Sequence, residues 1–357
     1  MKSKFGYMLL AVLLIFSLFI SACSDTGEEV TPTPDEEPVD EPAGEEPGDE
    51  PAGEATTVRI GMIATEGHPV VESMELFKDL IAERTDGRYD VQLFTGGTLG
   101  NELEMKDQVS LGSIEGQNVG SGITVGDVPA TQIFNFLYLF DSPEQMNNAY
   151  QSDAVQDLLG EFESNAGIKI LANNFFQGSR HMLSTKPVYE PDDMNGIKIR
   201  VPDGLPLWND QWEALGATTV SLGWSEVYTS LQQGVVDAVE VPANFMYDGE
   251  LYKQADYIIK TGHVLYANYL IFNEDFLAGL SEEDQQIFED AAVEAGEFCT
   301  QLVVDNEDSL ISMMEADGIE VIEIDREALR EIAFTVADRW ESEWGEGIFQ
   351  RIVDSIN

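Results

Sequence analysis

The chain has 357 residues, with 67 Asp and Glu against 18 Lys and Arg, and a formal net charge of −49. At ~100–200 residues per domain, this length allows about two domains with a substantial hydrophobic core. So acidic a chain repels phosphate backbones, which excludes charge-driven nucleic-acid binding, and its 43% of hydrophobic residues exclude a wholly disordered acidic tail.

The first 23 residues have the three parts of a secretory signal. Two lysines precede an apolar run over 8–20, which is shorter than the ~20 residues of a membrane-spanning helix. The run ends in Ile-Ser-Ala-Cys, which resembles the lipobox of bacterial lipoproteins, whose cysteine is lipidated. We therefore predict a lipoprotein signal peptide over 1–23 and lipidation of Cys23. An ordinary signal with a chance cysteine is the alternative.

Residues 24–57 form an acidic, proline-rich segment with 13 Asp and Glu and no Lys or Arg. Charge repulsion and proline stiffness favour an extended chain, with ~3.1 Å per residue where it is polyproline-like. We predict a tether. Residues 58–357 then hold 54 acidic and 16 basic residues. Such a surplus is typical of adaptation to saline or alkaline surroundings, and a binding surface is the alternative.

From residue 58 the pattern alternates between strands and helices. The predicted strands are 58–62, 89–93, 168–173, 197–201 and 235–241, and the predicted helices are 70–81, 142–164, 206–215, 225–233 and 282–316. Asn101 is the expected N-cap of a further helix. This rhythm favours α/β layers around largely parallel sheets. The last helix would be about 50 Å long, at ~1.5 Å per residue, so we expect it to link two lobes.

The sequence lacks the common catalytic and metal-binding motifs. There is no Cys-x-x-Cys, no His-Glu-x-x-His, no phosphate-binding loop and no Gly-x-Ser-x-Gly. The three histidines are far apart, and a lone histidine is more often packed than a ligand. Cys299 lies in an apolar helical stripe, so we expect a buried thiol without a disulfide rather than a reactive one. We therefore predict a protein that is not an enzyme and that uses no cofactor and no metal.

Arginines inside predicted secondary structure are scarce in so acidic a chain. Arg200 stands near the carboxyl end of the strand over 197–201, where ligands of open α/β sheets bind, and Arg180 follows another apolar strand. A guanidinium clasps a carboxylate through two parallel hydrogen bonds, so the two arginines suggest an anionic ligand. Ion pairs with acidic residues inside the fold are the alternative.

Several ordered motifs resemble the signature of TRAP-transporter (tripartite ATP-independent periplasmic) solute-binding proteins of the DctP-like type. They are Gly-Ser-Arg at 178–180, Asp-Asp-Met-Asn-Gly-Ile-Lys-Ile-Arg-Val-Pro at 192–202, Leu-Gly-Ala at 215–217, Trp-Ser-Glu-Val-Tyr at 224–228 and Leu-Gln-Gln-Gly-Val-Val-Asp-Ala at 231–238. The resemblance covers about residue 58 to the C-terminus. It implies an α/β, periplasmic-binding-protein-like clamp of two lobes, each a sheet flanked by helices, joined by hinge strands and a long helix.

The resemblance also implies a domain division and a function. Lobe I is expected over 58–177 plus about 267–306, and lobe II over 178–266 plus about 307–357. The implied function is capture of a small organic acid outside the cell membrane and its delivery to integral TRAP permease subunits. A binding lipoprotein of an ABC importer is the alternative, and a secreted enzyme and a structural surface protein are further rivals. We expect a monomer, lipid-anchored to the outer face of the bacterial membrane, with no nucleic-acid partner.

The resemblance assigns roles to individual residues of the second lobe. Arg200, in the Arg-Val-Pro element, is expected to form the salt bridge to the ligand carboxylate, and Arg180 to supplement it. Trp224 is expected to pack on the ligand's carbon frame. Glu240 is expected to be a polar contact or to orient one. Val241 stands where many members have an asparagine, so the choice between a sugar acid, a dicarboxylate and another carboxylate stays open.

The opposite lobe offers weaker candidates. Positions 63–68, including His68, and 118–121, including Asn118, are expected to line the site because they follow the first N-terminal elements. The glycine-rich segment around Gly120 lacks the Glu and Arg that sialic-acid-binding members use, which argues against that ligand.

Overall fold

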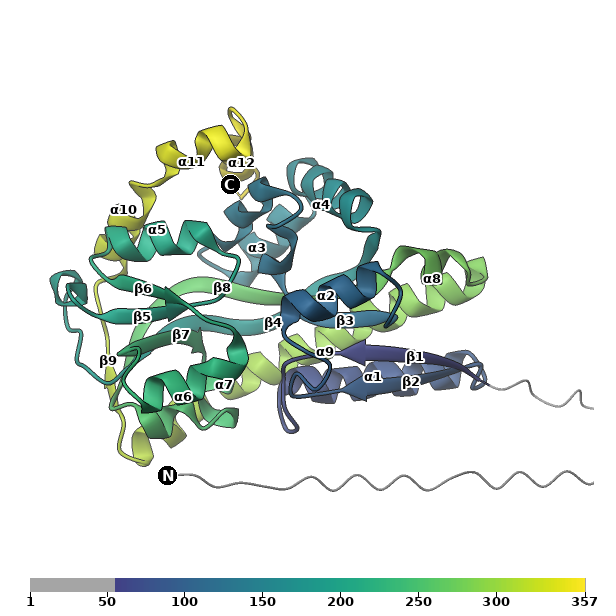
Figure 1. Cartoon of the computed structure of the whole chain (residues 1–357), viewed down its shortest axis with the longest axis horizontal. Helices are drawn as coiled ribbons and strands as arrows, with labels where there is room; N and C mark the ends of the chain where they lie inside the picture. Colours follow the sequence, from purple (N-terminus) through teal and green to yellow (C-terminus); the bar gives the residue numbers. More distant parts are fainter. Residues whose placement is uncertain (1–54, 357) are drawn as a thin grey trace, which may run out of the picture. The chain divides into compact units, whose positions relative to one another are not determined.

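The computed structural model describes residues 55–356 of the chain (Figure 1). The predicted signal peptide, Cys23 and nearly all of the predicted tether lie outside the described residues. Within 55–356, no helix combines the length and the apolar character needed to cross a membrane.

One sheet of nine strands organises the described residues, in the order β2-β1-β3-β8-β4-β7-β5-β6, with β9 paired to β8. The strands are β1 (Thr56–Gly61), β2 (Tyr89–Phe94), β3 (Gly116–Gly120), β4 (Ile168–Ser184), β5 (Lys198–Val201), β6 (Thr218–Ser221), β7 (Ala238–Pro242), β8 (Tyr257–Asn273) and β9 (Glu320–Ile322). The pairs among β1, β2 and β3 and among β5, β6 and β7 are parallel, whereas β4 and β8 are antiparallel to each other and to β7 and β3. The sheet is therefore mixed, with parallel strands at both ends, and not largely parallel as predicted.

The two 17-residue strands β4 and β8 connect the two parallel groups (Figure 1). They pair along most of their length, with register shifts at four places, including the step from Arg180 to Met182. Long strands of this kind match the predicted hinge strands. The predicted lobe boundaries at 177 and 266 both fall inside these strands.

Helices flank the sheet. They are α1 (Pro69–Arg84), α2 (Glu102–Ser110), α3 (Pro143–Tyr150), α4 (Asp153–Ala166), α5 (Pro206–Ala214), α6 (Val227–Gln232), α7 (Ala243–Asp248), α8 (Glu274–Ala278), α9 (Glu282–Ala316), α10 (Arg326–Phe334), α11 (Ala337–Trp344) and α12 (Ile348–Ile356). Short 3-10 helices cover Ser121–Thr124, Pro129–Asn135, Pro191–Met194, Trp224–Glu226 and Leu251–Gln254. The predicted N-cap is confirmed, because the Asn101 side chain accepts from the Glu104 N–H and the Glu104 side chain accepts from the Asn101 N–H.

The helix predicted over 142–164 is two helices, α3 and α4. Ser142 caps α3 by accepting a hydrogen bond from the Gln145 N–H at 3.2 Å. The Ser152 hydroxyl accepts from the Val155 N–H at 3.4 Å and begins α4. A serine side chain that takes a backbone N–H in this way competes with helix continuation. The prediction of one continuous helix was therefore wrong.

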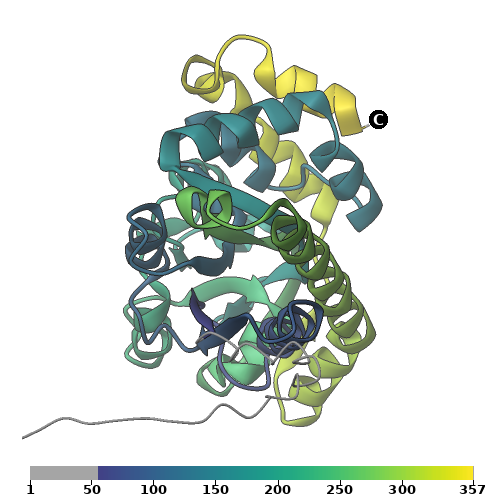
Figure 2. The ribbon, with the colours of Figure 1, turned by 90° about the vertical axis from the view of Figure 1, so that its right-hand side faces the viewer.

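The long helix α9 packs against β4 and α1, and also against α7 (Figure 2). α1 packs on β2, in one parallel group, and α7 packs on β4 and on β7 of the other group, so α9 contacts helices from both groups, as expected of a helix that links two lobes. Cys299 in α9 is fully buried and free, and burial raises its pKa to about 12. The expectation of a buried thiol is confirmed.

The C-terminal helices pack on helices from both predicted lobes. α10 packs on α5, and α12 packs on α3 and α4. Residues 307–357 thus touch elements from both predicted lobes, and the lobe division stays a prediction.

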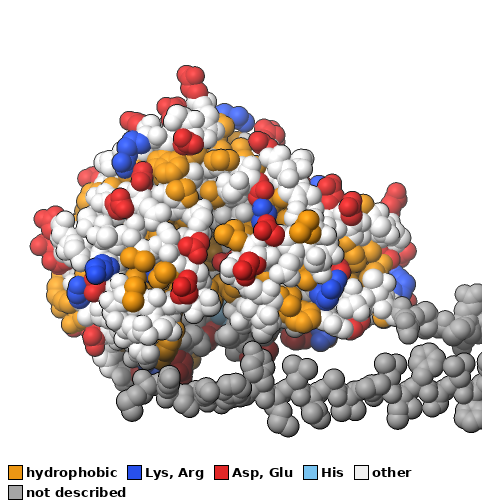
Figure 3. All heavy atoms as spheres, in the orientation of Figure 1, with side chains coloured by type: hydrophobic (Ala, Val, Ile, Leu, Met, Phe, Trp, Pro, Cys, Tyr) orange, Lys and Arg blue, Asp and Glu red, His pale blue; other side chains and the backbone are white. Residues whose placement is uncertain are grey.

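On the surface, Asp and Glu side chains are spread over the face in Figure 3, with fewer Lys and Arg among them.

Candidate functional site

A cavity of about 260 Å³ lies near the middle of the sheet order, where β4, β8, β7 and β5 meet the segments after β1 and β3. One part of its lining comes from Ile63, the start of α2 and the segment 119–126. The other part comes from β4, from the segments that follow β5 and β6, and from the start of α7. Parts of the chain far apart in sequence therefore build one site.

Arg200 lines this cavity near the carboxyl end of β5 and is only 3% exposed. Its Nε and Nη2 both donate to the Leu222 carbonyl oxygen, at 3.0 and 2.7 Å. Among residues 55–356, no Asp or Glu oxygen forms a salt bridge with it. Burial lowers the pKa of Arg200 to about 10, so the guanidinium is charged at neutral pH. A buried charge without a counter-ion is costly, and a ligand carboxylate in the cavity would offset that cost.

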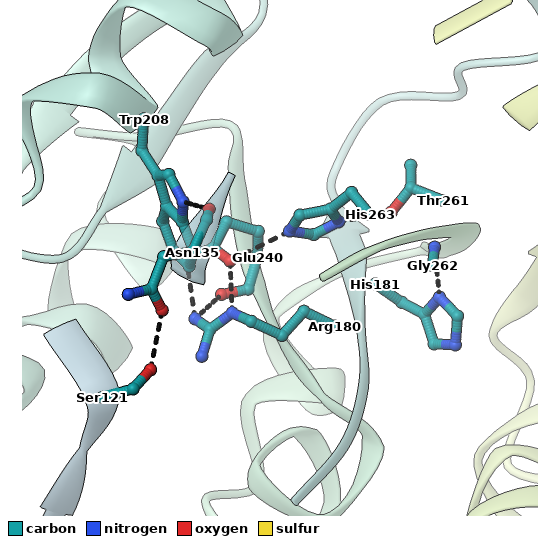
Figure 4. A network of polar contacts seen from close by, with 9 residues as sticks. All are labelled: Ser121, Asn135, Arg180, His181, Trp208, Glu240, Thr261, Gly262 and His263. Carbon is teal, nitrogen blue, oxygen red and sulfur yellow. Dashed lines mark hydrogen bonds and ion pairs between the residues drawn. The ribbon is translucent and has the colours of Figure 1, made fainter. Parts of the chain in front are cut away.

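Arg180 also lines the cavity, but its charge already has a partner (Figure 4). Its Nε and Nη2 donate to the two carboxylate oxygens of Glu240, at 2.6 and 2.8 Å, and Nη2 also donates to the Glu240 backbone oxygen. The guanidinium lies 4.5 Å from the ring centre of Tyr266 and 5.1 Å from that of Trp208. The alternative of an internal ion pair therefore applies to Arg180, while Arg200 has no such pair.

A buried histidine also holds Glu240, through the oxygen that accepts from Arg180 Nε (Figure 4). His263 Nε2 lies 3.1 Å from Glu240 Oε2, and His263 Nδ1 lies 2.8 Å from Thr261 Oγ1. Burial lowers the pKa of His263 to about 4, so the ring is neutral. The network assigns the proton to Nε2, which donates to Glu240, while Nδ1 accepts from the Thr261 hydroxyl. Burial alone would raise the pKa of Glu240, but Arg180 and His263 lower it.

The rest of the lining is mainly apolar and aromatic. Trp224 packs edge-on against Phe245, with ring centres 5.0 Å apart, and both residues line the cavity. Val241 lies in the lining and is 2% exposed. Tyr266 enters from β8, and burial raises the pKa of its hydroxyl, so it is neutral.

The structure brings Arg180, Arg200, Trp224 and Val241 to the cavity, and also Ile63, Val119 and Gly120 from the predicted segments 63–68 and 118–121. Glu240 lies directly behind Arg180. Two others are buried behind the lining. His68 caps α1, and its ring centre lies 4.4 Å from that of Phe245. Asn118 Oδ1 accepts from Asn268 Nδ2 at 2.7 Å. Direct ligand contact by His68 and Asn118 stays a prediction.

Four further residues with a polar or aromatic side chain line the cavity without any motif that predicted them, namely Glu102, Trp208, Phe245 and Tyr266. Acidic residues are so common in this chain that Glu102 carried no signal. Gly120 offers a structural clue, because a Cβ atom there would lie 1.6 Å from the Tyr266 hydroxyl. Only glycine leaves room for this tyrosine.

A mixed α/β fold with a charged, aromatic-lined cavity is typical of extracytoplasmic ligand-binding clamps. The profile of the DctP family, described as bacterial extracellular solute-binding protein, family 7, matches residues 60–343. The chain belongs to this family, and the resemblance seen in its motifs is confirmed. The family is extracellular, so the chain is exported, and its members are solute-binding proteins rather than enzymes.

Relatives and solved structures agree with this assignment. The ectoine/5-hydroxyectoine-binding periplasmic protein of Ruegeria pomeroyi is 33% identical over 61% of this chain and 64% of its own length. The 2,3-diketo-L-gulonate-binding periplasmic protein of Escherichia coli is 29% identical over 77% of this chain and 83% of its own. The structure of a TRAP periplasmic solute-binding protein of Roseobacter denitrificans with bound L-galactonate matches with a TM-score of 0.78 and 27% identity, covering 85% of this chain and 99% of that one. Such proteins are two-lobe clamps, so the predicted fold class is confirmed.

No group of three or more His, Cys, Asp or Glu side chains that could hold a metal ion occurs in residues 55–356. The cavity offers two guanidinium groups, the carboxylates of Glu102 and Asp203, and aromatic walls. These groups can bind and orient a small polar ligand.

Proposed function

We propose that this protein captures a small organic acid through Arg200 and delivers it to the membrane subunits of a TRAP-type transporter. One observation carries the proposal: Arg200 is buried at the cavity with no carboxylate partner within the described residues, although the chain is rich in acids. The named ligands of the relatives, among them ectoine, 2,3-diketo-L-gulonate and L-galactonate, all carry a carboxyl or carboxylate group. Membership of the DctP family favours a TRAP permease over an ABC importer as the receiving transporter.

Arg200→Met tests this role, because it removes the charge and keeps much of the side-chain stem. Losing a buried charge partner costs ~2–5 kcal/mol, so affinity for the acid should fall by ~30- to 5,000-fold. A thermal-shift screen of sugar acids, dicarboxylates, 2-oxo acids and ectoine would first find the ligand. A ligand at 100 times its dissociation constant adds ~2.7 kcal/mol of stability. Calorimetry would then compare the variants.

Arg330→Met is the matched control. Arg330 is an arginine on α10 that pairs at the surface with Asp141 at 2.7 Å, away from the cavity lining. Its loss should leave the affinity unchanged. An affinity change below threefold in the folded Arg200→Met variant would show that Arg200 does not hold the ligand.

We further propose that the protein works as a lipid-anchored monomer that releases its ligand unchanged. The Ile-Ser-Ala-Cys motif at 20–23 supports the anchor. Replacing Cys23 by Ala should move the protein from the membrane fraction to the soluble fraction, and a wild-type protein found only in the soluble fraction would exclude the anchor. The acid recovered after incubation with the protein should have the same mass as the acid that was added, because a different mass would indicate a catalysed reaction.

A further inference from the structure

The carboxylate of Glu102 shares the cavity with the arginines. Glu102 is the first residue of α2, and it lines the same cavity as Arg180 and Arg200. Its Oε1 accepts one long hydrogen bond, 3.4 Å from the Gly120 N–H. No Lys or Arg in residues 55–356 lies within salt-bridge distance of it, and no hydrogen bond from these residues reaches its Oε2. Burial raises the pKa of Glu102, and the charges of Arg200 and Arg180 act in the opposite direction.

Apart from the exposed Asp203, the charges around the cavity leave one positive and one negative group unpaired. Arg180 is neutralised by Glu240. The remaining pair is the guanidinium of Arg200 and the carboxylate of Glu102, with a further acid, Asp203, at the exposed part of the lining. A simple anion on Arg200 would bring a second negative charge into the same space as Glu102. A ligand that also carries a cationic group would add no net charge and would give each unpaired group a partner.

The walls of the cavity favour the same kind of ligand. Trp208, Trp224, Phe245 and Tyr266 present aromatic surface, and aromatic faces attract cationic nitrogen. Tyr266 and Asn101 are the neutral hydroxyl and amide side chains in the described lining. A polyhydroxylated acid needs a hydrogen-bonding partner for each buried hydroxyl, which such walls supply poorly.

We propose that the ligand of this cavity is a small zwitterion whose carboxylate pairs with Arg200 and whose cationic nitrogen faces Glu102 and the aromatic walls. This inference rests on the proposed function for the carboxylate end of the ligand. It adds a second recognition group of opposite charge, the carboxylate of Glu102 at the start of α2.

Matched pairs of ligands isolate the effect of the positive charge. We would titrate the purified protein with glycine betaine and 3,3-dimethylbutanoate, with proline and cyclopentanecarboxylate, and with ectoine and cyclohexanecarboxylate. The two members of each pair are close in size and share the carboxylate, but only the first has a cationic nitrogen. At least one zwitterion should bind ten or more times more tightly than its anionic counterpart.

Glu102→Gln removes the negative charge and keeps the shape of the side chain. It should reduce the preference for the zwitterion to below threefold, through weaker zwitterion binding. Asp107→Asn is the control, since Asp107 is an exposed acid on the same helix and is absent from the lining. It should keep the wild-type preference. Circular dichroism would verify that both variants are folded, and Glu102→Asp, which keeps the charge, should retain a preference.

Three results would overturn the inference: anionic counterparts that bind as tightly as the zwitterions, a preference that survives Glu102→Gln, or no zwitterion binding at all. If sugar acids such as L-gulonate then bind in a way that Arg200→Met abolishes, the proposed function stands and the zwitterion inference alone fails. If no acid of either class depends on Arg200, both fail.

Discussion

At the scale of single residues, the site depends on a glycine as well as on charged side chains. A Cβ atom at Gly120 would lie 1.6 Å from the Tyr266 hydroxyl and 2.7 Å from its ring carbon. The ring of Tyr266 lies against the guanidinium of Arg180. The backbone of Gly120 has φ −62°, which any residue can adopt, so space and not conformation selects glycine here.

We therefore expect Gly120→Ala to displace Tyr266 and weaken ligand binding by ~10-fold or more, since overpacking costs ~1–3 kcal/mol. Gly160→Ala is the control, because Gly160 is exposed in α4 with open space around its Cβ position. That change should leave affinity intact and raise the free energy of unfolding by ~0.5–1 kcal/mol. Calorimetry and urea unfolding would measure both. Unchanged affinity in Gly120→Ala would mean that Tyr266 takes no part in binding.

Sequence motifs located some of the residues that line the site and not others. Arg180, Arg200, Trp224 and Val241 lie within or beside ordered motifs, and the structure places them all on the cavity. Glu102 had no detectable signal among so many acids. The remaining aromatic residues come from α5, α7 and β8, and their convergence depends on tertiary packing that spacing along the chain does not encode.

At the scale of elements, the ion pair between Arg180 and Glu240 joins β4 to β7, which are adjacent antiparallel strands. Both side chains are almost fully buried. Glu240→Gln would leave Arg180 without its counter-ion beside Arg200, which already lacks one. Because a broken buried pair leaves an uncompensated charge, we expect a loss of ~3–5 kcal/mol in the free energy of unfolding.

Urea unfolding of Glu240→Gln would be compared with that of Glu323→Gln. The control breaks the pair between Lys260 and the largely exposed Glu323, which should cost at most ~1 kcal/mol. Equal losses in the two variants would show that the buried pair contributes no more than a surface one.

Helix and strand periodicity predicted most elements but not their lengths. The strand expected over 168–173 continues to Ser184 as β4, even though Asn174 and Gln177 interrupt its apolar pattern. Their side-chain nitrogens find partners in α9: Asn174 Nδ2 donates to the Val293 carbonyl oxygen at 2.9 Å, and Gln177 Nε2 lies 3.5 Å from Cys299 Sγ. Likewise, the break at Ser152 interrupts an apolar stripe that continues into α4. In both places a tertiary or side-chain hydrogen bond influences where the element ends, so the periodicity of the sequence alone could not predict its length.

At the scale of the whole molecule, capture of an acid by so acidic a protein requires a local reversal of charge. Residues 58–357 hold 54 Asp and Glu against 16 Lys and Arg, and the face in Figure 3 is correspondingly acidic. Surface charges separated by more than ~10 Å are screened at 0.1 M salt, whereas buried charges are screened much less. Arg200 can therefore attract a carboxylate inside the cavity despite the acidic surface.

The stability of the whole molecule should fall between pH 6.5 and pH 5 because two histidines are buried as neutral rings. Burial lowers the pKa of His68 to about 3 and that of His263 to about 4, from an ordinary value of 6.5. Below pH 6.5 the unfolded chain therefore takes up protons that the folded protein does not. The stabilisation is complete above pH 6.5 and declines as the pH falls, by ~1.4 kcal/mol per pH unit for each histidine.

His68→Asn isolates one of these contributions, since asparagine can keep the N-cap of α1 and does not titrate. A single variant is needed because Asp248 opposes this effect. Burial and the charge of Glu72 raise the pKa of Asp248 to about 6, so its protonation stabilises the folded protein as the pH falls over the same range. From urea unfolding at pH 6.5 and pH 5, we expect the wild type to lose ~1.5 kcal/mol more than His68→Asn. Equal losses in the two proteins would mean that His68 takes up its proton in the folded state, and that its ring is less isolated from water than its burial indicates.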